Sequence, residues 1–503
     1  MKNVLRLSEL INVDKCEDGL ISSLIREKNN DNPTVIGITS DSREVRPGYL
    51  FAALPGTKQD GARFIEDAIS RGAVAVVAKD QALNESLLSK TTIITASNPH
   101  LKFAKIAALF FPEQPEYIVA VTGTNGKTSV VEYTRQLWKQ LGHKSASLGT
   151  LGLIHDHSTG GAGLTTPDPA RLHRLLRCVT EKNIDRMAIE ASSHGLDQYR
   201  LDGVRIKAAA FTNLSQDHLD YHSDMQSYLS AKIRLFSDIL LNDGVAVLNA
   251  DGPEFKRIKE VCLSRKIETL TFGRANADIR ILGIRPCSTK QDIILEIYGD
   301  EYNLQLPLVG EFQALNALTA LGLILAVQKD PVDKCIEALR KLHGVPGRLE
   351  HVATHSNGAP IIVDFAHTPE ALSSVLSALR SHVLGRLICV FGAGGGRDRG
   401  KRQLMGKVSE DLADLCIITD DNPRDEPPEK IRREILLGCP SGLEIGDRGD
   451  AIKVGISQLK SEDLLLIAGK GHETKQIIGN ETIQFSDAEF VRETLKNAVG
   501  PKS

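Results

Sequence analysis

The sequence predicts an α/β protein of several domains. With 503 residues, the chain is too long for one hydrophobic core, so roughly two to four domains are expected. Strand-like apolar segments alternate with amphipathic helix patterns along most of it, which favours mostly parallel sheets with helices on both faces. Two short stretches rich in proline or glycine, residues 112–115 and 345–347, indicate domain boundaries. These points predict segments 1–112, 113–345 and 346–503.

Composition excludes several classes of protein. The net charge is −3, from 61 basic and 64 acidic residues, and such a balance does not require a nucleic-acid partner. The eight cysteines are scattered without a CxxC pair, which is typical of free thiols in a reducing compartment. The N-terminus lacks the apolar core of a signal peptide, and the longest apolar run, residues 317–327, is too short to span a bilayer. A cytoplasmic protein without membrane insertion is expected.

The first segment shows a small α/β pattern. Strand-like residues 35–38 and 74–78 alternate with a helix pattern at 62–70. Two polar loops, residues 39–43 and 55–61, lie between these elements. Such loops could bind a polar ligand, but solvated turns are the commoner explanation. By themselves, the loops assign no function.

The middle segment opens with a phosphate-loop pattern directly after an apolar strand. Gly123 and Gly126 permit a tight turn, and the helix start that follows presents backbone N–H groups that, with Lys127, can cradle phosphate. The Thr128 hydroxyl stands where a phosphate loop holds Mg²⁺. The loop is shorter than the GxxxxGK[ST] pattern, because Val121 occupies the first glycine position. An ordinary strand–turn–helix corner is the alternative, but glycine, lysine and threonine in this order favour a nucleotide site.

Polar residues end two further strands of the middle segment. The candidate strands are residues 186–190, 208–212 and 244–248. Ligands bind at the C-terminal ends of strands in parallel sheets, so Glu190 and Asn213 are candidates to face the phosphate loop. A capping or turn role is an equal alternative for both on position alone.

Other residues of the middle segment have weaker signals. Residues 217–222, DHLDYH, are rich in metal-ligand types, but zinc would need more ligands, and beside ATP a Mg²⁺ ion held by carboxylate and phosphate oxygens is favoured. A solvated or capping cluster is the simpler explanation. Lys232 lies on a helical pattern and, taken alone, would be a surface residue. Asn316 near a helix start is unfavourable unless it has a partner.

The last segment contains four strands that end in conspicuous polar loops, at residues 361–369, 387–402, 416–424 and 464–473. The glycine-rich second loop does not fit a dinucleotide fingerprint, because Arg397 occupies the third glycine position of GxGxxG and no acidic residue follows at the expected spacing. Four strands presenting Asp, His, Arg and Glu at one edge are hard to explain by stability alone. Arginines there suit bidentate capture of a carboxylate.

In this order, the motifs resemble those of the Mur ligases of peptidoglycan synthesis, and within them the UDP-N-acetylmuramoyl-tripeptide synthetases. The likeness runs from residue 39 to residue 473. It implies a small N-terminal α/β UDP-binding domain (1–112), a central P-loop ATPase domain with a mostly parallel sheet and helices on both faces (113–345), and a C-terminal Rossmann-like α/β domain that binds an amino acid (346–503).

The resemblance also implies roles for individual residues. Those matching ATP contacts are Gly123, Thr124, Asn125, Gly126, Lys127, Thr128, Asn316, Arg348, Asp364 and His367. Those matching contacts to the UDP-muramoyl-dipeptide are Ser40, Ser42, Thr57, Lys58, Gln59, Thr165, Thr166, Ser192, Gln198 and Arg200. Those matching contacts to meso-diaminopimelate are Arg397, Asp421, Asn422, Pro423, Arg424, Gly469 and Glu473.

Catalytic and metal roles follow from the same resemblance. It implies catalytic roles for Lys127, Glu190, His218 and Lys232, and Mg²⁺ binding by Thr128, Glu190, His218 and Lys232. The family carbamylates the lysine matching Lys232, which turns a cation into an anion that binds Mg²⁺. The sequence departs from the family pattern at two positions, with Phe365 in place of a tyrosine and Gln313 in place of an asparagine.

Residues 421–424, DNPR, resemble the signature of the members that add meso-diaminopimelate. This amino acid differs from lysine by one carboxylate, which an arginine such as Arg424 is suited to bind. The alternative is that Arg424 only pairs with Asp421 or Asp425. A lysine-adding or folylpolyglutamate-type ligase, and a non-catalytic nucleotide-dependent assembly protein, are the rival functions. Arg424 and the N-terminal UDP-type domain argue against the other ligases.

The resemblance implies a two-step reaction. ATP, as co-substrate with Mg²⁺, phosphorylates the free side carboxylate of the D-glutamyl residue in UDP-N-acetylmuramoyl-L-alanyl-D-glutamate. An amine of meso-diaminopimelate then attacks the acyl phosphate, giving an amide, ADP and phosphate. The expected partners are these small molecules, with no nucleic acid and no membrane insertion, and the expected state is a monomer.

Overall fold

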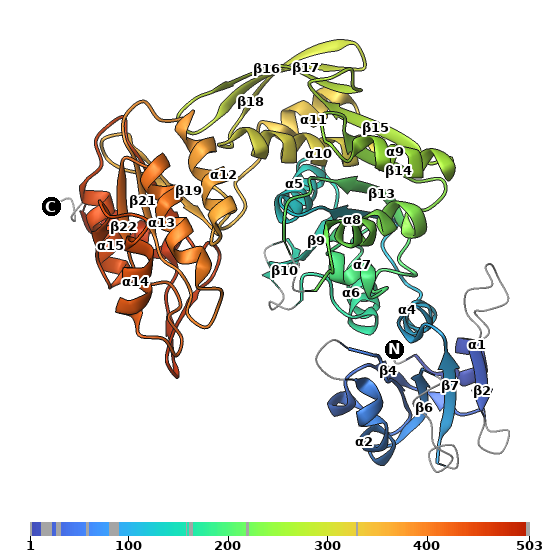
Figure 1. The fold of residues 1–503 in the computed structure, drawn as a ribbon. Helices are drawn as coiled ribbons and strands as arrows, with labels where there is room; N and C mark the ends of the chain where they lie inside the picture. The colour runs from blue at the N-terminus through green and yellow to red at the C-terminus, as the bar shows by residue number, and fades with distance from the viewer. Residues whose placement is uncertain are drawn as a thin grey trace. The chain divides into compact units, whose positions relative to one another are not determined.

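The computed structural model describes residues 3–11, 23–26, 32–56, 60–79, 90–156, 158–159, 164–217, 221–327 and 330–498. The chain forms two compact units, Met1–Phe272 with Thr319–Asp330, and Gly273–Leu318 with Pro331–Ser503. Sheets flanked by helices recur along the chain (Figure 1), so the α/β class predicted from the sequence is confirmed.

The first unit begins with a sheet of strand order β2-β7-β6-β5-β4. Its strands are β2 (Ser23–Arg26), β4 (Gly37–Thr39), β5 (Tyr49–Ala52), β6 (Ala73–Ala78) and β7 (Thr92–Ala96). All neighbours are parallel except β2 and β7. Helices α1 (Leu7–Ile11) and α4 (Pro99–Phe110) share one apolar core with it, and α2 (Ile65–Ser70) shares another. A short pair, β1 (Leu5–Arg6) and β3 (Thr34–Val35), accompanies this sheet.

A second sheet of the first unit carries the phosphate-loop strand β8 at its centre. Within this unit, its strand order is β11-β10-β9-β12-β8-β13-β14-β15. The strands are β8 (Tyr117–Thr122), β9 (Ser145–Gly149), β10 (Gly152–His155), β11 (Ser158–Thr159), β12 (Arg186–Glu190), β13 (Ile206–Phe211), β14 (Val245–Asn249) and β15 (Glu268–Gly273). Six adjacent strands run parallel, in the order β9, β12, β8, β13, β14 and β15. This confirms the predicted strands. It also places the C-terminal ends of β12, β8 and β13 side by side.

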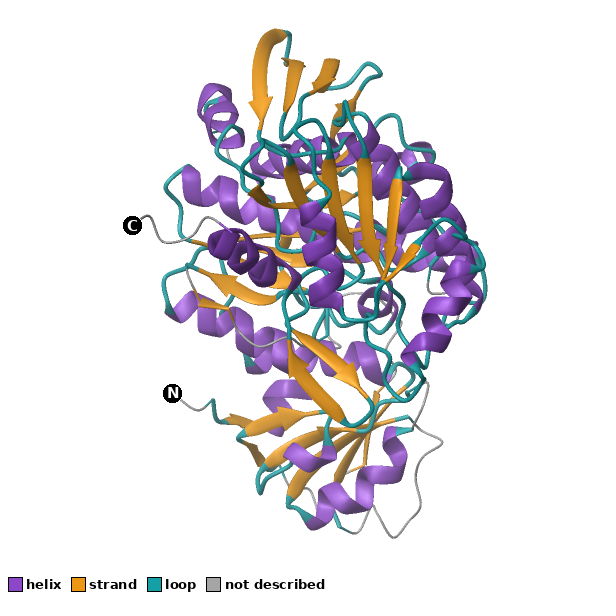
Figure 2. Cartoon of the chain, turned by 90° about the vertical axis from the view of Figure 1, so that its left-hand side faces the viewer, coloured by secondary structure: helices purple, strands orange, loops and turns teal. Residues whose placement is uncertain are grey.

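Helices cover both faces of this second sheet, as predicted (Figure 2). On one face, α6 (Pro169–Glu181), α8 (Met225–Arg234) and α9 (Phe255–Ser264) share an apolar core with β8 and β12. Helix α5 (Lys127–Gln140) packs on β8, β9 and β12 but contributes nothing to that core, so it covers the other face. Short helix α7 (Ser193–Asp197) follows β12.

The second unit begins with an antiparallel meander, β16 (Ile279–Pro286), β17 (Gln291–Ile297) and β18 (Asp300–Leu306). Ile293, Leu295 and Ile297 alternate with less buried residues along β17. The sequence interpretation missed this meander, because adjacent Ile293 and Ile294 hide the period of two. Helices α10 (Glu311–Val327) and α11 (Val332–Leu339) follow it.

The C-terminal sheet of the second unit has the strand order β19-β20-β24-β21-β22-β23. Its strands are β19 (Glu350–Thr354), β20 (Pro360–Asp364), β21 (Leu387–Phe391), β22 (Leu415–Ile418), β23 (Leu443–Glu444) and β24 (Leu464–Ala468), all parallel except β19. Because β20, β24, β21 and β22 are consecutive neighbours, the four predicted polar loops leave one edge of the sheet.

Alternate residues of these strands feed two cores, one on each face of the C-terminal sheet. Helices α12 (Pro369–Arg380), α13 (Gly400–Leu412) and α14 (Pro428–Leu436) cover one face. Helices α15 (Arg448–Ser457) and α16 (Asp487–Ala498) cover the other. A separate hairpin, β25 (Lys475–Ile478) and β26 (Glu481–Gln484), follows β24.

The structure also addresses the predictions of free thiols and of no membrane-spanning helix. The seven cysteines in the described ranges are free thiols, as predicted, and five of them are buried. No helix among the described residues is long and apolar enough to cross a bilayer.

Candidate functional site

The phosphate loop joins β8 to α5 through two glycines in left-handed conformations. Gly123 has φ +139° and Gly126, which caps α5, has φ +84°. A Cβ atom at position 123 would lie 1.9 Å from Thr212 Oγ1, so no larger residue fits there. The turn therefore needs both glycines, and it leaves the N-terminus of α5 available for an anion.

Asn213, after β13, supports this loop. The backbone N–H of Thr124 donates to Asn213 O at 2.8 Å, and that of Asn125 donates to Asn213 Oδ1 at 3.0 Å. The prediction that Asn213 faces the phosphate loop is confirmed. Lys127 donates from Nζ to the carbonyl oxygens of Thr124 at 2.6 Å and Gly123 at 3.0 Å, so its ammonium lies over the loop.

Lys232 reaches the same loop from α8. Its Nζ donates to Gly123 O at 2.7 Å, and its side chain is 1 % exposed. Burial, together with the nearby Lys127 ammonium, lowers the pKa of Lys232 to about 6. The interpretation of Lys232 as a surface residue is therefore wrong, because the face of α8 that carries Lys232 packs against the phosphate loop. No ion pair to Lys232 occurs in the described part of the chain.

Glu190 ends β12 and is held through Thr150. Its Oε1 accepts from the Thr150 backbone N–H at 2.8 Å, and its Oε2 accepts from the Thr150 hydroxyl at 3.2 Å. Glu190 and Thr128 line one small cavity. The structure thus brings these two predicted metal ligands together, and it adds Thr150, which sequence reasoning missed because an isolated threonine in a turn gives no signal.

Four of the residues predicted for the UDP-muramoyl-dipeptide form one connected cluster: Thr166, Ser192, Gln198 and Arg200. Thr166 donates from Oγ1 to Glu190 O at 2.8 Å and accepts from Ser192 Oγ at 3.0 Å. Arg200 donates to Thr166 O and to Gln198 Oε1, both at 2.6 Å. Burial lowers the pKa of the Arg200 guanidinium. These side chains therefore converge beside Glu190.

Two further contacts extend this cluster. The Thr165 hydroxyl lies 3.2 Å from Thr150 Oγ1, which ties Thr165 to the Glu190 group. Gln198 donates from Nε2 to Tyr221 OH at 3.2 Å, and Tyr221 donates to Asp197 Oδ2 at 2.7 Å. Tyr221 was not singled out from the sequence, since its neighbours were assessed only as metal ligands.

The N-terminal candidates follow two adjacent parallel strands. Ser40 follows β4 directly, and the buried Ser42 begins a 3₁₀ turn, Ser42–Glu44. Because β4 and β5 are parallel neighbours, the loops that leave them start side by side. Thr57, Lys58, Gln59 and His218 lie outside the described residues.

The predicted nucleotide contacts of the second unit also lie together. Asn316 donates from Nδ2 to Gln313 Oε1 at 3.0 Å, and Gln313 donates from Nε2 to Arg348 O at 2.9 Å. Asn316 thus has the partner that its place in a helix requires. Gln313, the departure from the family pattern, makes the link. Arg348 Nε is buried without a hydrogen-bond partner among the described residues.

Asp364, at the end of β20, fixes the turn after Arg348. Its two oxygens accept the backbone N–H groups of Leu349 and Ala366, each at 2.7 Å. Burial nevertheless raises the pKa of Asp364. The ring of Phe365, which replaces the family's tyrosine, lies 4.8 Å from the Arg348 guanidinium. His367 Nδ1 lies 2.9 Å from Phe365 O, which holds the imidazole at the same strand end.

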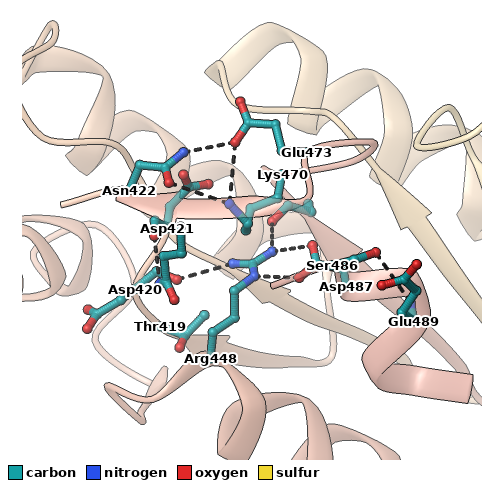
Figure 3. A network of polar contacts seen from close by, with 12 residues as sticks. Thr419, Asp420, Asp421, Asn422, Arg448, Lys470, Glu473, Ser486, Asp487 and Glu489 are labelled. Carbon is teal, nitrogen blue, oxygen red and sulfur yellow. Dashed lines mark hydrogen bonds and ion pairs between the residues drawn. The ribbon is translucent and has the colours of Figure 1, made fainter. Parts of the chain in front are cut away.

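The loops after β22 and β24 meet at the predicted acceptor site (Figure 3). Asn422 donates from Nδ2 to Glu473 Oε2 at 2.9 Å. Gly469 has φ +115°, and a Cβ atom there would lie 2.6 Å from Asp421 Oδ2. Only glycine permits this approach of the two loops.

Arg424 lies in the same loop with a left-handed backbone, φ +52°. Its guanidinium donates to Gly395 O at 2.8 Å, and it forms no ion pair within the described ranges. The alternative pairing with Asp421 or Asp425 is therefore wrong, because the Arg424 guanidinium bonds to backbone carbonyl oxygens and to no carboxylate among the described residues. Pro423 is buried in this loop, whereas Arg397 is exposed in the glycine-rich loop after β21.

A fully buried ion pair underlies these loops. Arg448, at the start of α15, binds both oxygens of Asp487 at 2.7 Å, and neither side chain is exposed. Arg448 also donates to Ala468 O at 3.0 Å and Asp420 O at 3.4 Å (Figure 3). These carbonyls lie one residue before Gly469 and Asp421, so the pair holds both loops from beneath.

We expect Arg448→Met to lower the free energy of unfolding of its domain by about 3–5 kcal/mol, because it leaves the Asp487 charge buried and unpaired. Denaturant titration followed by circular dichroism measures this. Lys453→Met, which breaks an exposed ion pair with Asp450 on the same helix, should cost at most about 1 kcal/mol. Equal effects of the two substitutions would contradict the assignment.

The described residues were also tested for a magnesium site. They contain no group of three His, Cys, Asp or Glu side chains suited to a metal. Thr128 and Glu190 nevertheless line one cavity and supply the hard oxygen ligands that Mg²⁺ prefers. The two side chains fit an ion whose remaining ligands come from phosphate and water.

Three protein-family models match successive parts of the chain. They describe the catalytic domain of the Mur ligase family at residues 34–120, the Mur ligase middle domain at 121–324, and the Mur ligase glutamate ligase domain at 347–471. The matches follow the order of the three predicted domains.

Curated relatives match over the full length. A protein of Bradyrhizobium diazoefficiens is 46% identical over 499 residues, 98% of this chain and 100% of its own length. One of Caulobacter vibrioides is 44% identical over 486 residues, 95% and 99% of the two chains. Both are named UDP-N-acetylmuramoyl-L-alanyl-D-glutamate–2,6-diaminopimelate ligase.

Solved structures agree. One of a UDP-N-acetylmuramoyl-L-alanyl-D-glutamate–2,6-diaminopimelate ligase has a TM-score of 0.71 and 32% identity, covering 93% of this chain and 96% of that one. A Mycobacterium tuberculosis folylpolyglutamate synthase complexed with ADP shares the fold, with a TM-score of 0.60, 18% identity and coverage of 73% and 91%. With its three-domain α/β fold and its full-length relatives, the chain belongs to the Mur ligase family.

Proposed function

We propose that the chain is an ATP-dependent ligase that joins meso-diaminopimelate to UDP-N-acetylmuramoyl-L-alanyl-D-glutamate. The observation that carries the choice of acceptor is Arg424, a guanidinium without a carboxylate partner in the described structure, in a loop beside Asn422 and Glu473. The names of the full-length relatives support the same reaction.

The phosphate loop would bind ATP through the N-terminus of α5. The Lys127 ammonium, over the carbonyls of Thr124 and Gly123, stabilises negative charge on the phosphoryl group as it transfers to the donor carboxylate. In the second unit, Asn316, Arg348, Asp364 and His367 are proposed nucleotide contacts, supported by their mutual network.

Thr128, Glu190 and carbamylated Lys232 are the residues proposed to hold Mg²⁺, and His218 is kept as a prediction. When bound, Mg²⁺ would neutralise phosphate charge. The carbamate proposal rests on a buried amine with no ion-pair partner in the described part of the chain, 2.7 Å from a loop carbonyl. Its formation would place an anion beside the Lys127 ammonium, in the position of an amine whose pKa is lowered to about 6.

The cluster of Thr165, Thr166, Ser192, Gln198 and Arg200 is proposed to orient the donor. The Arg200 guanidinium and the hydroxyls of this cluster surround the end of β12, which also carries Glu190. This placement would bring the D-glutamyl carboxylate toward the phosphate loop. Ser40, Ser42, Thr57, Lys58 and Gln59 remain predictions for the UDP end.

At the acceptor site, the chemistry of the residues matches a diamino dicarboxylate. Arg424 would bind the carboxylate that lysine lacks, and Arg397 would add a second positive charge. Glu473 and Asp421 would receive an ammonium group. The attacking amine of meso-diaminopimelate displaces phosphate from the acyl phosphate, which forms the amide and releases a proton.

Other properties remain proposals. We propose domain boundaries at residues 1–112, 113–345 and 346–503, which the order of the family models supports. A cytoplasmic location and a monomeric state stay predictions.

Release of ADP tests the proposed function directly. We expect turnover only when both UDP-N-acetylmuramoyl-L-alanyl-D-glutamate and meso-diaminopimelate are present, with the tripeptide product seen by mass spectrometry. Equal use of L-lysine would favour a lysine-adding ligase. ADP release that needs neither substrate, or none at all, would favour a nucleotide-dependent protein without ligase activity.

A further inference from the structure

Lys470 is a fully buried lysine between two glycines at the end of β24. Gly469 has φ +115° and Gly471 has φ +53°, conformations that most side chains avoid. A Cβ atom at Gly471 would lie 2.7 Å from that of Phe365. The chain is thus built for close packing around Lys470, whose side chain has no access to solvent.

The Lys470 ammonium has three acceptors for its three N–H donors. It donates to Lys475 O at 2.5 Å, to Glu473 Oε2 at 3.3 Å and to Asn422 Oδ1 at 3.5 Å. A buried charge is tolerated only when it is paired and hydrogen-bonded. All three contacts belong to the acceptor loops or to the strand beside them.

These contacts fix the orientation of the Asn422 amide. Its Oδ1 accepts from Lys470 and from the Ile477 backbone N–H at 3.0 Å, while its Nδ2 donates to Glu473 Oε2 at 2.9 Å. If the Asn422 amide were reversed, its NH₂ group would face the donors of Lys470 and Ile477, and its oxygen would face the Glu473 carboxylate. Lys470 and Ile477 therefore allow only one orientation.

Glu473 is constrained on one side only. Both hydrogen bonds of its carboxylate within the described residues fall on Oε2, and Figure 3 shows its second oxygen directed away from Asn422 and Lys470. That oxygen can accept from a ligand ammonium. The contact to Lys475 O anchors β25, whose Ile477 O in turn accepts the Arg424 backbone N–H at 3.0 Å.

We infer that Lys470 is a positioning residue for the amine acceptor: it holds the Asn422 amide, the Glu473 carboxylate and strand β25 in the arrangement that receives an amino acid. It acts through these groups, because its own Nζ is buried beneath them. The inference rests on the proposed function of the acceptor site and adds a residue to it.

Steady-state kinetics of full-length Lys470→Met tests the inference. We expect the KM for meso-diaminopimelate to rise roughly tenfold or more, because Glu473 and Asn422 lose a shared donor. The KM values for ATP and for the UDP-muramoyl-dipeptide should stay within twofold. Lys470→Gln, which keeps N–H donors, should recover part of the loss, and Lys453→Met, an exposed lysine of the same domain, should behave as wild type.

Three results would overturn the inference: an unchanged KM for the acceptor, an equal loss for all three substrates, or failure of both Lys470 variants to fold by circular dichroism, which would assign Lys470 to the fold alone. A crystal structure of Lys470→Met tests positioning independently of the reaction. Displacement of Glu473 and Asn422 is expected, and an unchanged geometry would overturn the inference. If wild-type protein does not use meso-diaminopimelate, the proposed function fails instead.

Discussion

Lys232→Ala should lower kcat by roughly 10²- to 10³-fold or more, with little change in the KM for meso-diaminopimelate. The substitution removes the amine 2.7 Å from Gly123 O, and with it the proposed carbamate. A short-chain carboxylic acid such as acetate or propionate should restore part of the activity, because its carboxylate can occupy the vacated space. Initial rates of ADP release at increasing acid concentration measure this rescue.

A control variant distinguishes the loss of the Lys232 amine from a general effect of removing a lysine from this unit. Lys256→Ala removes an exposed lysine of the same unit and should leave kcat unchanged, with or without acid. Unchanged activity of Lys232→Ala would remove the carbamate from the mechanism. Loss of activity without rescue, in a variant that unfolds at the wild-type denaturant concentration, would leave Lys232 a role in the loop but not as an anion.

Lys232 also shows where sequence reasoning stops. Its helical pattern is visible in the chain, but its burial depends on α8 packing against a loop 109 residues away. Local periodicity carries no information about such a long-range contact. The role proposed for Lys232 comes from the family resemblance, and the structure adds a supporting observation, an amine whose pKa is lowered by burial and by the nearby Lys127.

Strands were easier to predict than polar networks. The strand ends at Thr122 and Glu190 follow from β-branched, apolar segments bounded by glycine or polar residues, and β8 and β12 match them. The position of Asn213 followed from the rule that ligands gather at the C-terminal ends of parallel strands. The antiparallel meander β16–β18 was missed, because its alternation is imperfect.

Partners within the site could not be read from spacing. Thr150 holds Glu190 from 40 residues away, and Gln313 links Asn316 to the Arg348 backbone. Threonine and glutamine are too common in turns and helices for either to stand out. Their roles arise from tertiary packing, which decides whether a polar side chain meets water or another residue.

The second large effect is expected at Arg424. Arg424→Asn should lower kcat/KM for meso-diaminopimelate roughly 10²-fold, about 3 kcal/mol, through loss of charged hydrogen bonds to the distal carboxylate. Asparagine tolerates the left-handed backbone at φ +52°, so the loss reports the guanidinium and not strain. Arg424→Lys keeps the charge but not the planar fork and should recover only part of the activity.

The preference between meso-diaminopimelate and L-lysine as acceptor is the most informative measurement for this prediction. In the Arg424→Asn variant, no guanidinium is left without its carboxylate partner when L-lysine binds, so the ratio of kcat/KM values for meso-diaminopimelate and L-lysine should fall toward one. Arg433→Ala, an exposed arginine of the same domain, should preserve the wild-type ratio. If Arg424→Asn lowered both rates equally, the arginine would support the loop without reading the carboxylate. The basis for selecting this acceptor would then have to lie in Arg397 or in Glu473.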